Sequence, residues 1–388
     1  MLTTRSLMIA GIGAAALFSA TDASAIYIRH DRSATPHEEL AAMFPATGYF
    51  GRTFGQSCTA TLISPTQVLI AAHCVDQSGG PGFFTPDGTP DSSVSGYAFG
   101  LGANVPNTLT PNVASIAINP GWVSSGGDAA YDFAVLTLSS PITSVAPALV
   151  TSENPVGHLG AAVGYGLQGT GTSHSDPPGS DDKLAVTNMI ERYGDDPYYS
   201  NNPTLQFDFD SPSNNTNTFG SSTPLDLEGG TAGGDSGSPL MAQFGDAWFI
   251  TGVLNTGYND YGPEFRYGDV SIYAAVQTAS NLAWLASQGV RIIEDTTPVL
   301  GDANRDWFVD QTDLDMVLAN WGSSVDPGTG ADVSGDGLVS AADLDILLAQ
   351  WGEGTAFPGV PLAAAVVPEP GSLALLATGL MFLRRRRR

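Results

Sequence analysis

The sequence predicts an all-β protein, a barrel or a sandwich, followed by a small helical module. Between residues 50 and 290, nine segments have strand length and β-branched or aromatic content, and clusters of Gly, Pro, Ser, Asn and Asp separate them. Only residues 275–288 show a helical pattern there, with Gly289 as a stop. Many short strands with turn signals are typical of closed or two-layered β folds. The predicted strands are residues 58–63, 67–71, 113–118, 133–138, 161–165, 184–192, 205–209, 248–254 and 270–274.

The first residues predict a signal peptide, residues 1–25. Arg5 supplies a positive charge, an apolar run follows over residues 7–20, and the stretch ends on Ala-Ser-Ala at 23–25, the small-x-small form of a signal peptidase site. A short core helix is the alternative, and the strictly N-terminal position argues against it. We therefore expect export, with cleavage after residue 25 exposing Ile26 as the amino terminus.

The charge balance excludes nucleic acid and anionic lipid as partners. The 388 residues carry a formal net charge of -25, although five arginines stand together at the C-terminus. Such a surface repels polyanions, and it suits an extracellular protein or one that binds divalent cations. At 42% hydrophobic residues the chain has ample material for a core.

Two cysteines, Cys58 and Cys74, are the only ones in the chain. In an oxidising compartment two cysteines close together in sequence are more often bridged than free, so we predict a Cys58–Cys74 disulfide. Metal binding is the weaker alternative, because no second pair is present to complete a tetrahedral site.

The run Gly-Gly-Asp-Ser-Gly-Ser-Pro at residues 233–239 surrounds one hydroxyl, that of Ser236, with small residues. A backbone turned this tightly exposes the hydroxyl to attack a substrate, although a purely structural turn is the alternative. A catalytic role requires a general base and an orienting carboxylate elsewhere in the chain.

His73 and Asp132 are the candidates for these roles. His73 directly follows a predicted apolar strand and stands beside Cys74, so the disulfide would hold it rigidly as a general base. Asp132 begins another apolar strand, where burial requires a hydrogen-bond partner such as an imidazole N–H. Asp128 is the rival carboxylate, but its two flanking glycines indicate an exposed loop.

Three blocks in the order His, Asp, Ser resemble the signatures of the chymotrypsin-like (trypsin superfamily) serine proteases: Ala-Ala-His73-Cys, Tyr-Asp132-Phe-Ala-Val-Leu and Gly-Asp-Ser236-Gly-Ser-Pro. The resemblance covers residues 26–293. It implies two packed antiparallel β-barrels with a C-terminal helix and a His73/Asp132/Ser236 triad in the cleft between them. It also implies that Cys58 and Cys74 are bridged.

The resemblance further implies an oxyanion hole and a specificity pocket. The backbone N–H groups of Gly234 and Ser236 would hold the oxyanion. Gly230 stands six residues before Ser236, where members that cut after Lys or Arg carry an aspartate, so trypsin-like specificity is not expected. Other departures are Ser238 in place of a second glycine and Asn255-Thr256-Gly257 in place of Ser-Trp-Gly, whereas Asp226 or Glu228 offers an alternative pocket charge. The expected pocket residues are Gly230, Asn255, Gly257 and Ser271.

Asp235, next to the predicted nucleophile, has a family role as well. In this family the residue before the serine often pairs with a freed N-terminal amine and so forms the active site. Cleavage after residue 25 would place that amine on Ile26, and we expect an Ile26–Asp235 ion pair. The alternative is that Asp235 hydrogen-bonds only within its own loop.

After a predicted linker, residues 294–300, the chain repeats itself at a spacing of 30 residues and forms a duplicated module, residues 301–353. In each copy oxygen-bearing side chains occupy positions 1, 3, 5, 9 and 12 of a calcium loop, and position 7 offers a backbone carbonyl. Trp307 stands at position 6 of the first copy, where glycine normally makes the turn, and position 12 is aspartate in both. The expected calcium ligands are Asp302, Asn304, Asp306, Phe308, Asp310 and Asp313, then Asp332, Ser334, Asp336, Leu338, Ser340 and Asp343.

Two such loops, each followed by one helix, resemble a type I dockerin. The resemblance implies two calcium sites, with no cofactor needed for catalysis, and docking onto a cohesin-like partner. Apolar residues would form a small core that calcium stabilises, namely Leu314, Val317, Leu318, Leu344, Leu347 and Leu348.

The C-terminal tail has three parts after a predicted spacer, residues 354–366. Val-Pro-Glu-Pro is followed by an apolar run over residues 371–383 and then by five arginines. The tail, residues 367–388, resembles a PEP-CTERM sorting signal, which implies a short transmembrane helix for transient anchoring, and processing by an exosortase.

These interpretations combine into a secreted or cell-surface serine endopeptidase that acts on protein or peptide substrates. A catalytically silent, protease-like adhesion or scaffold protein is the alternative. The complete triad argues against it, because a fold kept for binding has no need of all three residues. Hydrolysis of non-peptide esters by the same residues stays open.

Overall fold

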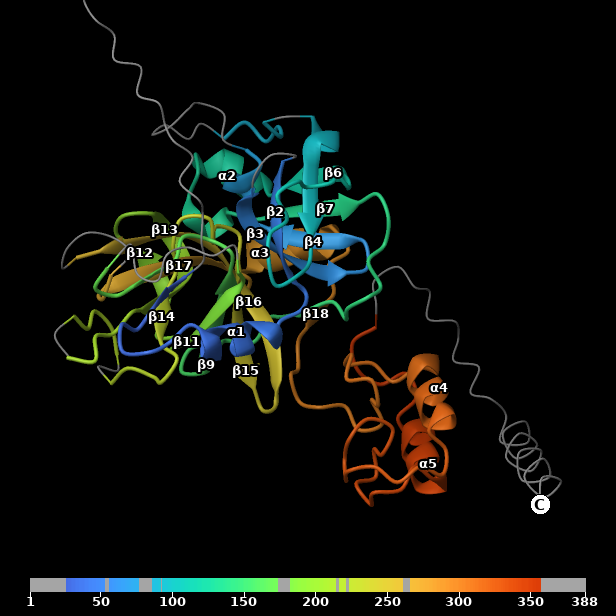
Figure 1. Cartoon of the computed structure of the whole chain (residues 1–388). Coiled ribbons are helices and arrows are strands. Elements are labelled where there is room, and N and C mark those ends of the chain that lie inside the picture. The colour runs from blue at the N-terminus through green and yellow to red at the C-terminus, as the bar shows by residue number, and fades with distance from the viewer. Residues whose placement is uncertain are drawn as a thin grey trace, which may run out of the picture.

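The structure, a computed structural model, describes residues 26–52, 56–76, 86–91, 93–173, 182–213, 216–220, 223–260 and 266–356. The signal peptide and the sorting tail lie outside these residues, and so does most of the predicted spacer before the tail. Two large β-sheets and a separate pair of helices dominate the chain (Figure 1).

The first large sheet has six strands in the order β5-β2-β3-β4-β7-β6, and all its pairs are antiparallel. β3 and β4 lie in the middle of this sheet, and β7 lies next to β4. Apolar side chains of β4 and β7 are buried, among them Val68, Leu69 and Leu136. Its strands are β2 (Thr47–Arg52), β3 (Gln56–Ser64), β4 (Gln67–Ile70), β5 (Tyr97–Gly100), β6 (Val113–Ile118) and β7 (Ala134–Leu138).

The second large sheet follows the path β11-β9-β15-β16-β17-β13-β12, and β8 pairs with both β16 and β18 in parallel. A small third sheet has the order β10-β1-β14. The strands are β1 (Tyr27–Ile28), β8 (Leu149–Thr151), β9 (Leu159–Gly164), β10 (Gly169–Thr170), β11 (Leu184–Met189), β12 (Arg192–Asp196), β13 (Ser200–Asp208), β14 (Gly229–Gly230), β15 (Pro239–Phe244), β16 (Ala247–Asn259), β17 (Asp269–Ala275) and β18 (Ile292–Ile293).

Few helices accompany the sheets. In the β region they are α1 (Thr35–Ala42), α2 (Pro120–Ser125) and α3 (Ala279–Ser287), with the short 3-10 turns η1 (Ala72–Cys74), η2 (Val94–Gly96) and η3 (Ala129–Tyr131). The helix predicted over residues 275–288 is α3, which starts later because Thr278 caps it through the Asn281 N–H. Every predicted strand overlaps an observed one.

The prediction of two closed barrels is confirmed only as a mainly β fold. Among the described residues, no strand ladder joins β5 to β6 or β11 to β12. Asn112, directly before β6, nevertheless hydrogen-bonds Tyr97 and Phe99 of β5. One buried cluster nevertheless contains residues of both, for example Phe50 and Leu136 of the first sheet with Val163 and Ile250 of the second. The two sheets therefore share a core.

The C-terminal module consists of α4 (Gln311–Ala319) and α5 (Ala341–Ala349), each preceded by a loop. Asp310 and Ser340 cap the two helices in equivalent capping boxes with Asp313 and Asp343. Val309, Leu314, Val317, Val339 and Leu347 form a buried cluster of their own. The duplicated sequence thus gives a duplicated structure.

The predicted linker, residues 294–300, is held to the β region at one point. Glu153 accepts hydrogen bonds from the Thr296 N–H at 2.8 Å and from the Thr296 hydroxyl at 3.0 Å, and Thr296 is 7% exposed. Thr296 in the linker is therefore fixed to Glu153, which lies two residues after the end of β8.

Candidate active site

His73 lies where β4 leaves the first sheet and turns into η1. The predicted Cys58–Cys74 disulfide is confirmed, and it ties η1 to β3. The residue after the histidine is thus covalently fixed to the neighbouring strand, which restricts the backbone on which the imidazole stands.

Asp132 lies at the end of η3, directly before β7, and its carboxylate is fully buried. It accepts hydrogen bonds from the His73 backbone N–H at 2.8 Å and from His73 Nδ1 at 2.6 Å. A carboxylate only accepts, so Nδ1 carries the hydrogen and Nε2 keeps a lone pair. Asp128 instead caps η3 through the Ala130 N–H at 2.9 Å.

Asn255 in β16 supplies a third donor to this carboxylate. Its Nδ2 lies 2.6 Å from Asp132 Oδ2, the oxygen that also accepts from His73. The pairing register of β16 with β17 shifts between Leu254 and Thr256, so Asn255 occupies a bulge. Sequence position alone suggested a pocket residue, whereas the structure places this amide against Asp132.

The surroundings of His73 affect its basicity. Burial lowers the pKa of the imidazole, but the charge and the hydrogen bond of Asp132 outweigh it, so the net effect raises the pKa of His73 above 6.5. A general base must be neutral, and therefore activity is expected to fall as the pH drops through a value above 6.5.

A profile of kcat/KM against pH checks this expectation. Asn255→Ala removes one donor from Asp132, so more of the carboxylate's negative charge acts on the imidazole and the acidic limb is expected to move to higher pH. An acidic limb at or below pH 6 in the unaltered chain would contradict the assignment.

Ser236 is half-exposed on the turn that leads into β15. Gly234 and Gly237 flank it at φ +98° and +82°, and a Cβ on Gly237 would lie 2.5 Å from the Thr59 carbonyl oxygen. The Thr59 N–H donates to the Ser236 carbonyl at 2.9 Å, which joins this turn to β3. Only glycine permits so close a passage.

The turn and the histidine meet at the disulfide. Cys74 Sγ lies 3.6 Å from the Ser236 carbonyl oxygen and 3.9 Å from His73 Nε2. Among the contacts of the described residues there is no hydrogen bond between the Ser236 hydroxyl and the His73 imidazole. The structure therefore gives the histidine–aspartate pair and a serine turn in its vicinity, and the third link of the triad is a proposal.

Asp235, beside the serine, is fully buried. Its carboxylate accepts from the Gly166 N–H at 2.8 Å, from the Ala232 N–H at 2.9 Å and from the backbone of Ile26. Burial raises the pKa of Asp235 to about 6, against the effect of these donors. Ile26 itself is 1% exposed, because β1 is held between β10 and β14.

The predicted pocket residues fall close to this region. Gly230 of β14 pairs with Tyr27 of β1, and Ser271 of β17 shares a 2.9 Å hydrogen bond with Thr231. Gly257 pairs with Ser271 across β16 and β17. Gly230, Gly257 and Ser271 thus lie on strand segments that are close together. The buried hydroxyls of Thr231 and Ser271 bring no charge to this region.

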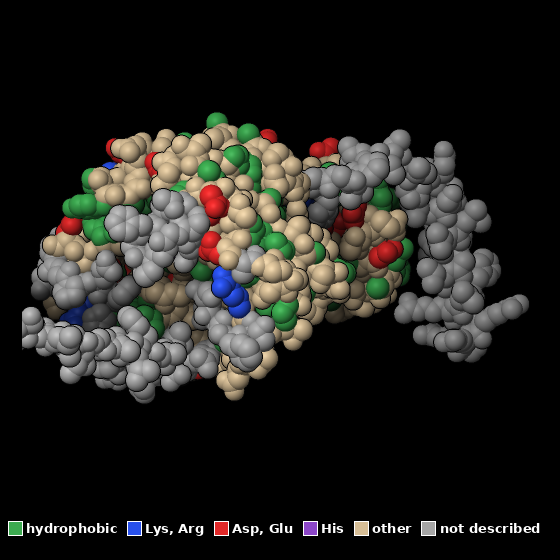
Figure 2. Space-filling model, turned by 90° about the horizontal axis from the view of Figure 1, so that it is seen from above, with side chains coloured by type: hydrophobic (Ala, Val, Ile, Leu, Met, Phe, Trp, Pro, Cys, Tyr) green, Lys and Arg blue, Asp and Glu red, His purple; other side chains and the backbone are tan. Residues whose placement is uncertain are grey.

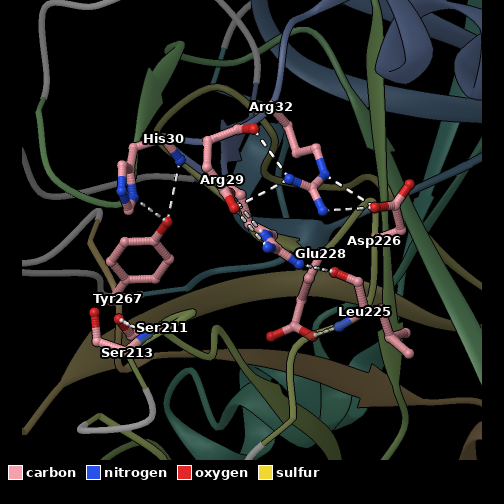
Figure 3. A network of polar contacts seen from close by, with 10 residues as sticks. Arg29, His30, Arg32, Ser211, Ser213, Leu225, Asp226, Glu228 and Tyr267 are labelled. Carbon is pink, nitrogen blue, oxygen red and sulfur yellow. Dashed lines mark hydrogen bonds and ion pairs between the residues drawn. The ribbon is translucent and has the colours of Figure 1, made fainter.

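Figure 3 shows the alternative pocket charges, Asp226 and Glu228, in a network with the segment after β1. The Glu228 carboxylate accepts from the N–H groups of Leu225 and Asp210, at 2.5 and 2.7 Å. Burial raises the pKa of Glu228 to about 7. Asp226 is an exposed surface partner of Arg32 at 2.7 Å. Both carboxylates therefore serve local contacts in this structure.

The two loops of the C-terminal module have a donor set that fits calcium. Each closes on its twelfth residue: Asp313 accepts from the N–H groups of Ala303 and Asn304, and Asp343 accepts from the Ser334 N–H. Asp313, Asp332 and Asp343 are fully buried carboxylates. Preformed loops lined by oxygen donors match the requirements of a hard cation.

Within the described part of the chain, one set of three metal-ligating side chains lies within 4.8 Å of one another, Cys58, His73 and Cys74. Because its two cysteines form the disulfide, this set is no metal site. No three carboxylates of either described loop come that close to one another. Figure 2 shows acidic side chains scattered over one face of the molecule, with few basic ones.

Two sheets that share a core, with a histidine–aspartate pair beside a glycine-flanked serine, define the class of β-sheet serine peptidases. The chain belongs to the trypsin family, whose model matches residues 32–284. A dockerin type I domain matches residues 300–350, and a PEP-CTERM protein-sorting motif matches residues 366–388. The sorting motif implies export with C-terminal sorting to the cell surface.

Among solved structures, the chain is similar to a Glu endopeptidase in complex with MPD. The sequence identity is 20%, the TM-score is 0.39, and the match covers 64% of this chain and 91% of that chain. In the part of the chain that the structure describes, there is no helix long and apolar enough to cross a membrane.

Proposed function

We propose that the protein is a serine endopeptidase that cleaves peptide bonds through His73, Asp132 and Ser236. The observation that carries the proposal is the 2.6 Å contact between His73 Nδ1 and the buried carboxylate of Asp132, near the turn of the half-exposed Ser236. Membership of the trypsin family supports it.

The proposed mechanism assigns each group a role. Asp132 holds the Nδ1–H tautomer, and the Nε2 lone pair of His73 takes the proton of Ser236 as its oxygen attacks the peptide carbonyl. His73 then gives this proton to the leaving amine, and water hydrolyses the resulting acyl-enzyme. The backbone N–H groups of Gly234 and Ser236 stabilise the oxyanion, at about 3–4 kcal/mol per donor in related systems.

Ile26 and Asp235 complete the active form of the enzyme in this proposal. The backbone of Ile26 already donates a hydrogen bond to the Asp235 carboxylate. Signal peptidase cleavage would convert that N–H into a charged amine, which is the partner that a buried carboxylate needs. No further activation cleavage is then required.

The duplicated module, residues 301–353, and the tail, residues 367–388, have roles in docking and sorting in this proposal. We propose that the twelve loop residues hold two calcium ions, that the module docks onto a cohesin-like partner, and that an exosortase-type enzyme processes the tail. Calcium ions supply charge neutralisation for the loop carboxylates. Chelator is expected to lower the melting temperature of the module, and an unchanged calorimetric trace with and without chelator would contradict the calcium sites.

A fluorophosphonate probe separates the enzyme from the silent scaffold, since it reacts only with an activated serine. We expect covalent labelling of the natural chain and none of Ser236→Ala. Ser238→Ala is a matched control, because it removes a buried hydroxyl two residues away. A folded natural chain that stays unlabelled would favour the scaffold.

A further inference from the structure

The duplication of the C-terminal module provides an internal comparison between its two loops. Position 6 is Trp307 in the first loop and Gly337 in the second, and both have positive φ, +65° and +81°. A side chain as large as tryptophan is strained in this conformation. The Trp307 side chain also makes a contact outside its own loop.

That contact lies on the peptidase domain. The Trp307 side chain is 6% exposed, and its ring stands edge-on to Phe249 of β16, with centroids 4.9 Å apart at 80°. Trp307 belongs to the same buried cluster as Phe244 and Ile293 of the second sheet. The Trp307 side chain of the first loop is thus buried among residues of the peptidase domain.

A polar contact reinforces the apolar one. Arg291, which precedes β18 and is 6% exposed, donates from Nε to the Thr355 carbonyl at 2.6 Å, and the Thr355 N–H donates to the Trp307 carbonyl at 2.8 Å. The carboxylates of Asp306 and Asp302 act electrostatically on the Arg291 guanidinium. Thr355 therefore links Arg291 of the peptidase domain to the backbone of Trp307, in addition to the ring contact.

In the second loop, several described residues are more exposed than their counterparts in the first, although Asp332 is buried. Leu338 is 44% exposed, whereas its counterpart Phe308 is half-buried. Asp336 is exposed, whereas its counterpart Asp306 is half-buried. Since the two loops have related sequences, we attribute the difference to the contact of Trp307 with the peptidase domain.

We propose that the first calcium loop is an intramolecular clamp, anchored by Trp307 on the peptidase domain, so that calcium in this loop stabilises the peptidase. This inference rests on the calcium binding proposed above. It assigns this role to the first copy and not to the second, which has Gly337 in place of Trp307.

The link between ion and clamp runs through one carboxylate. Asp302, at position 1 of the loop, accepts the Trp307 N–H at 2.7 Å and the Asp306 N–H at 3.1 Å. A cation held by Asp302 fixes the backbone of position 6, and with it the direction of the Trp307 ring. Opening of the loop releases the ring from Phe249.

Hydrogen exchange of the full chain tests the clamp, in a Ser236→Ala background that prevents self-digestion. With free calcium at ten times its dissociation constant, the open population falls about tenfold, so exchange in the loops is expected to slow by that factor. The same slowing is expected in the peptidase segments around Phe249 and Arg291. In Trp307→Gly the loops keep the response and the peptidase segments lose it.

Two further variants keep the test decisive. Phe249→Leu leaves the calcium loop untouched and is expected to uncouple the peptidase segments as Trp307→Gly does. Leu338→Ala, in the exposed second loop, is the matched control and is expected to retain the full response. Peptidase segments that respond equally in Trp307→Gly and in the natural chain would overturn the clamp. Loops that show no calcium response in any variant would overturn both the clamp and the proposed calcium sites.

Discussion

Asp132→Asn is expected to lower kcat by about 10⁴ while the chain still folds. An asparagine at this position can donate as well as accept, so it no longer fixes the hydrogen on His73 Nδ1. The imidazole then presents the wrong tautomer to Ser236, and proton transfer becomes slow. Steady-state kinetics on a peptide substrate, with KM compared separately, measures the effect.

Asp128→Asn is the matched control for this variant. Asp128 lies four residues earlier, and its carboxylate caps η3 and accepts from Asn202 at 3.0 Å. Asparagine is also a good N-cap, so activity close to that of the natural chain is expected. Equal losses in the two variants would show that Asp132 acts through the fold of this segment and not on His73.

A chain that begins at Ile26 is expected to be about 10²–10³ times more active than one with residues 1–25 attached. Removing one partner of a buried ion pair costs about 3–5 kcal/mol, and each 1.4 kcal/mol is a factor of ten. Without the amine, the loop of Asp235 and Ser236 loses that stabilisation. Comparison of kcat/KM for the two forms measures the difference, and equal activities would contradict the ion pair.

The two forms should also differ in how their stability depends on pH. With residues 1–25 attached, the pKa of Asp235 is raised from 3.8 to about 6, so the folded chain binds a proton more tightly than the unfolded chain. This contribution to stability is complete below pH 3.8 and is lost as the pH rises through about 6. The amine of Ile26 would lower the pKa again and remove the loss. Melting temperatures of both forms over this range check the sign.

The local pattern of the sequence predicted the strands that bury apolar side chains. Residues 67–71 and 133–138 contain β4 and β7, which pair with each other. The apolar residues of each segment were enough to predict it as a strand. β2 and β15 escaped the prediction, because β2 contains two glycines and β15 begins with a proline. These segments are extended because they pair with strands that are distant in sequence, and the residues of the segments themselves do not indicate that pairing.

The candidate site divides in the same way. His73, Asp132 and Ser236 stand out because each combines a reactive group with a flanking pattern. The contact of Asn255 with Asp132 could not be predicted from the sequence. It depends on the bulge in β16, which determines where the Asn255 amide points. Trp307 was visible as a departure from glycine, but its anchor, Phe249, lies 58 positions away in another domain.

Trapping of an acyl-enzyme tests the central claim most directly. The chain beginning at Ile26 is mixed with an activated ester of a peptide acid, quenched in acid within the first turnover and digested for mass spectrometry. The proposed mechanism predicts the acyl mass on the peptide that contains Ser236, in an amount close to one per chain. Turnover with the acyl group on another residue, or with no covalent adduct at all, would contradict it.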